Sequence, residues 1–290
     1  KAHAALLFVC SIGHAKKTIK KFNPDIVVGF GGYPSASAVQ AAFGLKIKTM
    51  IHEQNSIIGL TNKILIKKVD QIVCCYQKAY QEFPKEKTLL LGNPRASVIV
   101  HEQPKDVYDE YHLDRQKKVV TIVMGSLGSQ TVNQTMKECM DQFKGKDYQV
   151  VYVSGKPYYE SMKAYENENV HIVPYVNDMP SLMHITDLIV SRAGASTLAE
   201  LTALGVPAIL IPSPYVSANH QEYNARELVN NQAADMILEK DLTGEKLIST
   251  IDAIINDESR LNVLKENAQK LGKPNALEDM YRVIVDMLGK

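Results

Sequence analysis

Short apolar runs alternate with helical patterns along most of the chain. In the first part, apolar runs occupy residues 26–30, 49–52, 71–75 and 88–91, and helical patterns lie between them at 37–43, 60–67 and 78–83. Apolar runs of this length, separated by segments with a 3.6-residue period, are typical of βαβ units and of parallel sheets. We therefore predict a first parallel sheet, with fewer strands than a complete doubly wound half and no Gly-rich loop at its start.

A second series of the same kind begins at residue 119. Its predicted strands lie at 119–124, 149–153, 170–172, 188–190, 208–211 and 234–237, and its predicted helices at 131–142, 158–165, 179–184, 197–204 and 220–231. The tail 245–290 reads as wholly helical, and the more polar stretch 101–118 reads as a linker with one short helix. Alternation of this kind predicts an α/β fold with two parallel-sheet domains and a cleft for a ligand.

The boundaries follow from these changes in pattern. We predict an N-terminal domain over residues 1–96, a linker over 97–118, a C-terminal domain over 119–272, and a C-terminal helix over 273–290 that returns toward the first domain. The chain begins at Lys1 rather than at Met, and we interpret it as lacking its natural start.

Composition changes this picture little. The chain is 45% hydrophobic and 22% charged with a net charge of +1, so we expect no strong field for nucleic acid. The cysteines lack metal-site spacing, and Cys74 and Cys75 lie in an apolar run, which indicates buried, reduced thiols. No apolar run approaches the ~20 residues of a membrane helix. We expect no metal and no cofactor.

Three loops rich in small residues follow predicted strands. They contain Gly31 and Gly32, Gly125 to Ser129, and Arg192 to Ser196. Backbone N–H groups at helix starts bind anions, and glycine allows close approach of a phosphate. Each loop by itself is also explained as a plain strand-to-helix turn. Three of them in one chain favour phosphate binding.

Glu200 and Gln221 each have two interpretations. Thr197 and Glu200 have the S/T-x-x-E spacing of a capping box, and spacing alone favours that role. In doubly wound folds, however, an acid near such a loop binds the ribose of a nucleotide. Gln221 either contacts sugar hydroxyls or lies at a solvated helix start, where Asn219 with Glu222 fits a cap.

Polar and basic residues gather in the first part of the chain. His52 opens a polar segment at a strand end, and Arg95 follows Asn93-Pro94; either is explained as a site residue or as an ordinary structural or surface residue. The segment lacks the second histidine of H-E-x-x-H, which argues against zinc. Two basic clusters suit either an anionic membrane surface or a solvated helix face. These clusters are Lys16, Lys17, Lys20 and Lys21, and Lys63, Lys67 and Lys68.

Several motifs together resemble one family. In order they are GGYPS (31–35), HEQNSIIGLTNK (52–63), FPKEK (83–87), GNPR (92–95), GSLGS (125–129), YVNDM (175–179), SRAGASTLAE (191–200) and HQEYNA (220–225). The chain is identified by them as similar to the MurG family within glycosyltransferase family 28, from about residue 24 to near the C-terminus. The resemblance implies a GT-B fold and inverting transfer of N-acetylglucosamine from UDP-GlcNAc to lipid I, which forms lipid II for peptidoglycan, cell shape and division. It implies a peripheral location on the cytoplasmic side of the cell membrane, against an anionic lipid surface.

The resemblance also implies roles for individual residues. Glu200 would hold the ribose hydroxyls and Val176 would meet uracil through its backbone, which outweighs the capping interpretation of Glu200. The remaining UDP-GlcNAc residues would be Ser126 and Arg95 at the diphosphate, Ala195, Gln221 and Asn55 at the donor sugar, and Ser196 and Thr197 beside them. Gly31, Gly32, Tyr33 and Ser35 would face the acceptor diphosphate.

The chain departs from the family in three places. The family's opening G-x-G-G-H loop, whose histidine is a candidate base, has no counterpart here, so no catalytic residue is assigned. Ala36-Ser37 stand where the family has Gly-Pro, and Met124-Gly125 stand where it has two glycines. These departures leave two alternatives open, a UDP-GlcNAc-binding remnant without turnover and a UDP-GlcNAc 2-epimerase. The sequence does not determine the oligomeric state.

Overall fold

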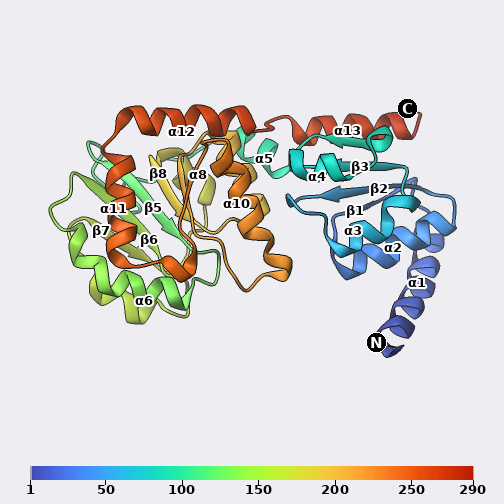
Figure 1. Ribbon diagram of the computed structural model, residues 1–290, viewed down its shortest axis with the longest axis horizontal. Coiled ribbons are helices and arrows are strands. Elements are labelled where there is room, and N and C mark those ends of the chain that lie inside the picture. Colours follow the sequence, from blue (N-terminus) through green and yellow to red (C-terminus); the bar gives the residue numbers. More distant parts are fainter. Residues whose placement is uncertain (1, 290) are drawn as a thin grey trace. The chain divides into compact units, whose positions relative to one another are not determined.

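The computed structural model describes residues 2–289, with side chains described from residue 7 onward. The described chain forms two compact units, one made of residues 2–97 and 275–289 and the other of Val98–Pro274 (Figure 1). Each unit has its own parallel sheet. The ten strands found among the described residues agree with the ten predicted apolar runs to within one residue at each end, so the predicted α/β class is confirmed.

The first unit contains a four-stranded parallel sheet in the order β1-β2-β3-β4. Alternate residues of a strand point to opposite faces. On one face Ile51 and Ile72 pack with Val39 of α2, and on the other Met50 and Val73 pack with Met280 of α13. The elements are β1 (Ile26–Gly29), α2 (Gly32–Gly44), β2 (Lys48–Glu53), α3 (Leu60–Leu65), β3 (Gln71–Cys74), α4 (Gln77–Glu82), β4 (Thr88–Leu90), α5 (Arg95–His101) and α13 (Ala276–Met287).

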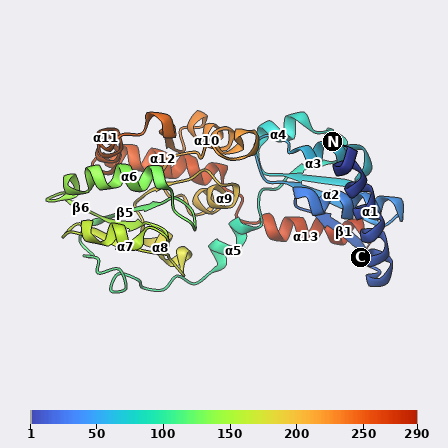
Figure 2. The same ribbon diagram turned by 90° about the horizontal axis from the view of Figure 1, so that it is seen from below.

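A helix that the sequence analysis did not predict opens the first unit. Helix α1 (Ala2–Phe22) packs against α2 through Ile19, which lies among Ala41 and Ala42 (Figure 2). Ile12, Ala15 and Ile19 share one face of α1, because they are three and four residues apart. That spacing was the signal in the sequence that could have predicted the helix. The apolar residues 4–9 directly before it obscured the helical period.

The second unit contains a six-stranded parallel sheet in the order β10-β9-β8-β5-β6-β7. The chain winds outward from β5 to β7, then returns to β8 beside β5 and winds the other way. The topological switch point is therefore between β5 and β8. Doubly wound sheets bind ligands outside the carboxyl ends of the strands at this point. The strands are β5 (Lys118–Val123), β6 (Tyr148–Val153), β7 (Val170–Val173), β8 (Leu188–Ser191), β9 (Ala208–Leu210) and β10 (Asp235–Met236).

Helices cover both faces of the second sheet (Figure 1). Both faces of β6 are buried, which explains why its sequence is apolar apart from Gln149. The helices are α6 (Gln130–Cys139), α7 (Tyr159–Met162), α8 (Met179–Ile185), α9 (Ala195–Leu204), α10 (His220–Asn230), α11 (Gly244–Ile255) and α12 (Glu258–Leu271). Among the helices of the described residues, none combines the length and the apolar character needed to span a membrane.

Two predictions about helices were wrong. The tail 245–290 was predicted as wholly helical, but its helices are interrupted: α11 ends at Ile255, and the Asp257 side chain caps α12 by accepting a hydrogen bond from the Arg260 N–H at 3.0 Å. A second break follows α12, where Pro274 cannot continue a helix. The short helix predicted within 101–118 lies earlier, as α5, and residues 102–117 form turns.

Candidate functional site

A cavity of about 700 Å³ lies at the carboxyl edge of the second sheet. It lies at the switch point, because its walls come from the segments that follow β5, β8 and β9, together with the segment after β7. Its lining includes five residues that the sequence analysis assigned to UDP-GlcNAc, namely Ser126, Val176, Thr197, Glu200 and Gln221. The fold thus brings together residues that are far apart in the sequence.

The loop after β5 is held tightly against the loop after β6. Gly128 has a φ of +73°, and a Cβ atom at this position would lie 2.2 Å from the carbonyl oxygen of Ser154. Only glycine fits so close an approach. Ser129 then caps α6, since its hydroxyl accepts a hydrogen bond from the Val132 N–H at 3.4 Å. The start of α6 therefore faces the cavity, where the positive end of the helix dipole favours an anion.

A second helix start lines the same cavity. Helix α9 begins at Ala195 with Gly194 as its N-cap and no side-chain cap. Thr197 lies within the first turn, so the predicted Thr197–Glu200 capping box is not formed and that interpretation was wrong. Glu200 lies one turn further on, 8% exposed, and lines the cavity together with Gly194 and Thr197. Ala195 and Ser196 lie between them in the first turn.

Arg192 links the loops around the cavity, a role that the sequence analysis missed. Its guanidinium donates hydrogen bonds to the Ser129 hydroxyl at 2.8 Å and to the Ile211 carbonyl at 3.0 Å. It also forms an ion pair with Glu239 at 2.5 Å, and the two side chains are only 13% and 6% exposed. The only signal in the sequence was an arginine directly after a buried strand, and nothing in the sequence pointed to its partners.

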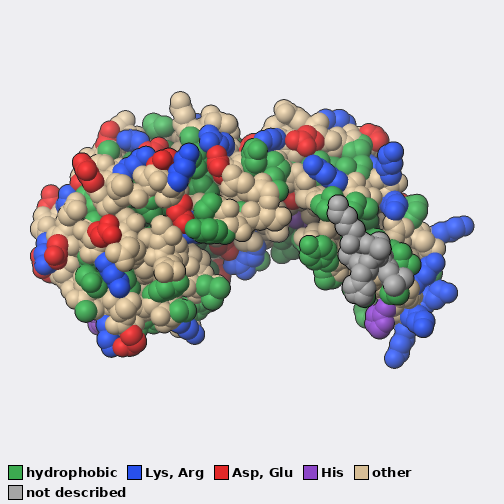
Figure 3. Space-filling view, turned by 60° about the horizontal axis from the view of Figure 1, so that its bottom comes forward, with side chains coloured by type: hydrophobic (Ala, Val, Ile, Leu, Met, Phe, Trp, Pro, Cys, Tyr) green, Lys and Arg blue, Asp and Glu red, His purple; other side chains and the backbone are tan. Residues whose placement is uncertain are grey.

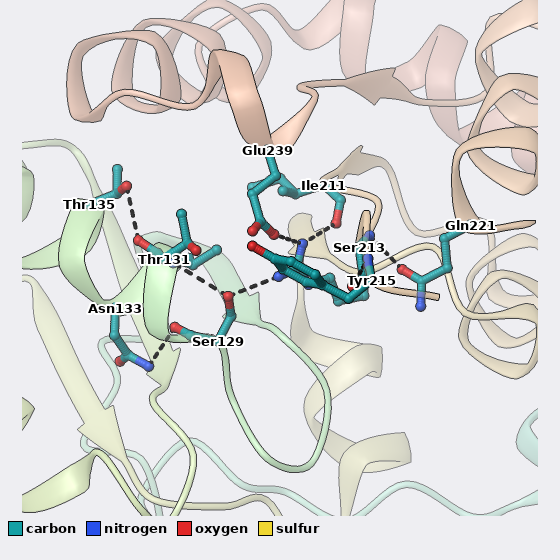
Figure 4. A network of polar contacts seen from close by, with 11 residues as sticks. Ser129, Thr131, Asn133, Thr135, Ile211, Ser213, Tyr215, Gln221 and Glu239 are labelled. Atoms are coloured by element: carbon teal, nitrogen blue, oxygen red, sulfur yellow. Dashed lines mark hydrogen bonds and ion pairs between the residues drawn. The ribbon is translucent and has the colours of Figure 1, made fainter. Parts of the chain in front are cut away.

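Gln221 is fixed by a main-chain contact. Its side-chain oxygen accepts a hydrogen bond from the Ser213 N–H at 2.8 Å, and both residues line the cavity (Figure 4). Asn219 is the N-cap of α10, which begins at the next residue, but its side chain does not form the predicted capping hydrogen bond. The Asn219 backbone is left-handed with a φ of +52°, and its side-chain amide donates to Glu222 at 2.6 Å instead of accepting a helix N–H.

The acceptor residues predicted in the first unit lie at a helix start rather than in a loop. Helix α2 begins at Gly32, five residues before the predicted start, so Gly32, Tyr33 and Ser35 form its first turn. Gly31 precedes it with a φ of +85°, a conformation that suits glycine. Tyr33 is 90% exposed. This start therefore offers a third set of helix N–H groups.

The other two predicted residues of the first unit also follow strands of its sheet. Asn55 comes after β2, and both its N–H and its side-chain amide donate to Glu53 Oε1, at 3.0 and 3.4 Å. Arg95 comes after β4 and begins α5, and its N–H donates to the Asn93 side-chain oxygen at 3.0 Å. Together with the start of α2 after β1, these residues occupy the carboxyl edge of the first sheet.

His52 and the thiols of Cys74 and Cys75 are largely enclosed by the protein. His52 is buried, and its Nε2 lies 2.9 Å from the Gly92 carbonyl. Burial lowers its pKa and raises the pKa of Cys74 to about 12, while that of Cys75 lies well above its ordinary value for the same reason. The cysteines of the described chain are unpaired thiols. Within residues 2–289, no group of three His, Cys, Asp or Glu residues is arranged to hold a metal ion.

Comparison with known proteins identifies the family. The model described as glycosyltransferase family 28 C-terminal domain matches residues 119–280, and that described as glycosyltransferase family 28 N-terminal domain matches residues 2–74. A Bacillus cereus protein named UDP-N-acetylglucosamine--N-acetylmuramyl-(pentapeptide) pyrophosphoryl-undecaprenol N-acetylglucosamine transferase 1 is 44% identical over 98% of this chain and 79% of its own length. A protein of the same name, without the number, from Listeria monocytogenes serotype 4a is 42% identical over 97% of this chain and 79% of its own length.

Solved structures agree with this result. The crystal structure of Acinetobacter baumannii MurG superposes with a TM-score of 0.82 at 27% identity and covers 98% of this chain and 79% of that one. A putative UDP-N-acetylglucosamine 2-epimerase from Listeria monocytogenes gives a TM-score of 0.76 at 13% identity over 97% of this chain and 79% of its own, which shows a shared fold alone. The architecture is GT-B, as the motifs predicted. The chain belongs to glycosyltransferase family 28.

Proposed function

We propose that this chain transfers N-acetylglucosamine from UDP-GlcNAc to the undecaprenyl-linked muramoyl-pentapeptide lipid I and so forms lipid II for the bacterial cell wall. Relatives named for this transfer align with almost the whole chain at 41–44% identity. The structural observation that carries the proposal is the buried carboxylate of Glu200 in a cavity that is also lined by two helix starts. This combination provides an acceptor for ribose hydroxyls and donors for a diphosphate.

In this proposal the second unit holds most of the donor. Glu200 accepts hydrogen bonds from the ribose hydroxyls, and Val176 meets uracil through its backbone. Ser126 contacts the diphosphate at the start of α6. The first turn of α9 (Ala195, Ser196 and Thr197) and Gln221 contact the donor sugar. On the family resemblance we also assign Arg95 to the diphosphate and Asn55 to the donor sugar.

The two helix starts also serve the chemistry. When the acceptor hydroxyl attacks the anomeric carbon, the bond to UDP breaks and negative charge develops on the diphosphate. Oriented N–H groups and helix dipoles stabilise charge that develops at a fixed place, and they need no reorganisation during the reaction. The start of α2 (Gly31, Gly32, Tyr33 and Ser35) offers the same chemistry to the diphosphate of the acceptor.

We further propose that residues 1–96 form the acceptor-binding, membrane-facing domain, that residues 119–272 form the donor domain, and that the protein acts at the cytoplasmic side of the cell membrane. Support comes from the exposed basic residues Lys16, Lys17, Lys20 and Lys21 of α1. Lys and Arg side chains gather over this end of the first unit in Figure 3. Basic residues near an anionic lipid surface each contribute about 1 kcal/mol to binding.

The test uses labelled UDP-GlcNAc with a lipid I analogue. Acceptor-dependent release of UDP together with a disaccharide product supports the proposal. Epimerised sugar formed without acceptor, or donor binding without turnover, refutes it.

Glu200→Gln tests the assignment of the ribose. We expect UDP affinity to fall at least tenfold, because a charge-assisted hydrogen bond contributes about 1.5–3 kcal/mol. Glu138→Gln, an exposed position near the end of α6, is the matched control and should leave the affinity unchanged. Equal affinities for the two variants would contradict the assignment.

A further inference from the structure

Glu53, at the end of β2, is a buried carboxylate to which the proposed function gives no role. It is 3% exposed. Its Oε1 accepts from the N–H of Asn55 at 3.0 Å and from the Asn55 side-chain amide at 3.4 Å. Its Oε2 accepts from the N–H of Gly59 at 2.9 Å and from the Asn62 side-chain amide at 2.8 Å. All four donors belong to the short segment that follows the strand.

The four contacts determine the path of that segment. Asn55 lies at its beginning, and Gly59 is the N-cap of α3, which has no side-chain cap of its own. The Asn62 side chain is buried and also donates to the His52 carbonyl at 3.2 Å. Hydrogen bonds to an ionised acceptor are about twice as strong as neutral ones, and burial strengthens them further. The carboxylate is therefore the centre around which residues 55–62 turn.

The same geometry argues against a proton-transfer role for Glu53. A general base needs a lone pair within reach of the substrate hydroxyl. An ionised carboxylate has about four lone-pair sites, and here four N–H donors occupy the two oxygens. Glu53 is thus occupied by its own loop.

We propose that Glu53 is a positioning residue for sugar transfer that acts by fixing Asn55. Both the main-chain N–H and the side-chain nitrogen of Asn55 are directed at one oxygen of Glu53, so this single atom sets both the backbone and the amide orientation of Asn55. The inference rests on the proposed function, because it gives Asn55 a contact with the donor sugar. Small errors in the placement of such a group are costly to the rate of transfer.

A double-mutant cycle tests the proposal. In Glu53→Gln one carboxylate oxygen becomes an NH2 group that faces N–H donors, so part of the loop must shift. We expect kcat/KM for UDP-GlcNAc to fall about 10- to 100-fold in Glu53→Gln and by a similar factor in Asn55→Ala. The double variant should fall no further than Asn55→Ala, because Glu53 acts through that residue. A double variant that falls by the product of the two single effects overturns the proposal.

A matched control separates positioning from loss of stability. Thr88→Val, at the start of β4, removes the hydrogen bond that the buried Thr88 hydroxyl donates to the Pro84 carbonyl at 2.6 Å and has no contact with Glu53, so we expect it to lower the thermal midpoint while leaving kcat/KM within about threefold of the parent. A fall in kcat/KM as large as that of Glu53→Gln would mean that general loosening is responsible, and the proposal would be wrong. Should Glu53→Gln not fold, Glu53→Asp replaces it in the cycle, since it keeps the charge but withdraws the carboxylate from Asn55.

A readout that is independent of turnover distinguishes this inference from the proposed function. Amide hydrogen exchange at Asn55 and Gly59 should accelerate at least tenfold in Glu53→Gln, and exchange at Asn55 that stays as slow as in the parent overturns the inference. Absence of transfer by the parent protein would refute the proposed function instead.

Discussion

Removing the guanidinium of Arg192 should destabilise the second unit more than any exposed charge deletion. In Arg192→Met, Glu239 keeps a carboxylate that is 6% exposed but loses the cation that it contacts at 2.5 Å. Removal of one partner from a buried ion pair costs about 3–5 kcal/mol, because the remaining charge is left desolvated. The same substitution also removes the hydrogen bonds that Arg192 donates to Ser129 and Ile211. We expect the free energy of unfolding to fall by about 3–5 kcal/mol.

The partner variant determines how much of that loss is electrostatic. In Arg192→Met with Glu239→Leu neither charge is buried, and replacement of a buried pair by apolar side chains is often close to neutral. The remaining cost should be about 1–2 kcal/mol, from the two hydrogen bonds that Arg192 gave to Ser129 and Ile211. We therefore expect the double variant to be more stable than Arg192→Met alone by about 2–3 kcal/mol.

Urea unfolding followed by far-ultraviolet circular dichroism measures these values, since the chain has no tryptophan to report by fluorescence. Lys163→Met is the control in the same unit. Its ion pair with Glu160 is 50% and 78% exposed, so it should cost less than about 1 kcal/mol. The reasoning is refuted if Arg192→Met costs no more than this control, or if adding Glu239→Leu makes the protein less stable still.

Three further outcomes follow from the cavity and from the buried histidine. Gly128→Ala should lower UDP affinity at least tenfold, because the new methyl group would lie 2.2 Å from the Ser154 carbonyl oxygen. Calorimetry measures the affinity, and the circular dichroism spectrum should stay unchanged. Unaltered affinity would contradict the role of that loop. Gln221→Glu keeps an acceptor for the Ser213 N–H but loses the amide donor. The Kd for UDP-GlcNAc should therefore rise about tenfold more than the Kd for UDP. Equal changes in the two Kd values would exclude a contact between Gln221 and the sugar. The lowered pKa of His52 means that its protonation costs more in the folded state, so stability should be constant above pH 7 and fall as the pH drops below the ordinary value of 6.5. Urea midpoints at pH 8, 7, 6 and 5 test this. His52→Asn should reduce the slope, and the remainder should come from His171, whose pKa is also lowered by burial. An identical slope in the His52 variant would assign it entirely to other groups.

The strands, the fold class and the family could all be predicted from the amino-acid sequence. Apolar runs of three to six residues between helical patterns identify buried parallel strands, because burial on both faces demands continuous apolar side chains. Prediction from the sequence failed where the same short motif fits two local conformations. Gly31 to Ser35 were interpreted as a loop, but Gly32 begins α2. Thr197 was interpreted as a cap but lies inside α9.

Which side chains meet depends on how the chain folds in three dimensions. Arg192 and Ser129 are 63 residues apart, and they bond because β8 returns to pair with β5. Glu53 looked like one polar residue among several, and its role is visible only once the following segment turns back onto it. Periodicity reports burial and local conformation, which depend on neighbouring residues. Hydrogen-bond partners depend on the order of strands in the sheet, which no local pattern encodes.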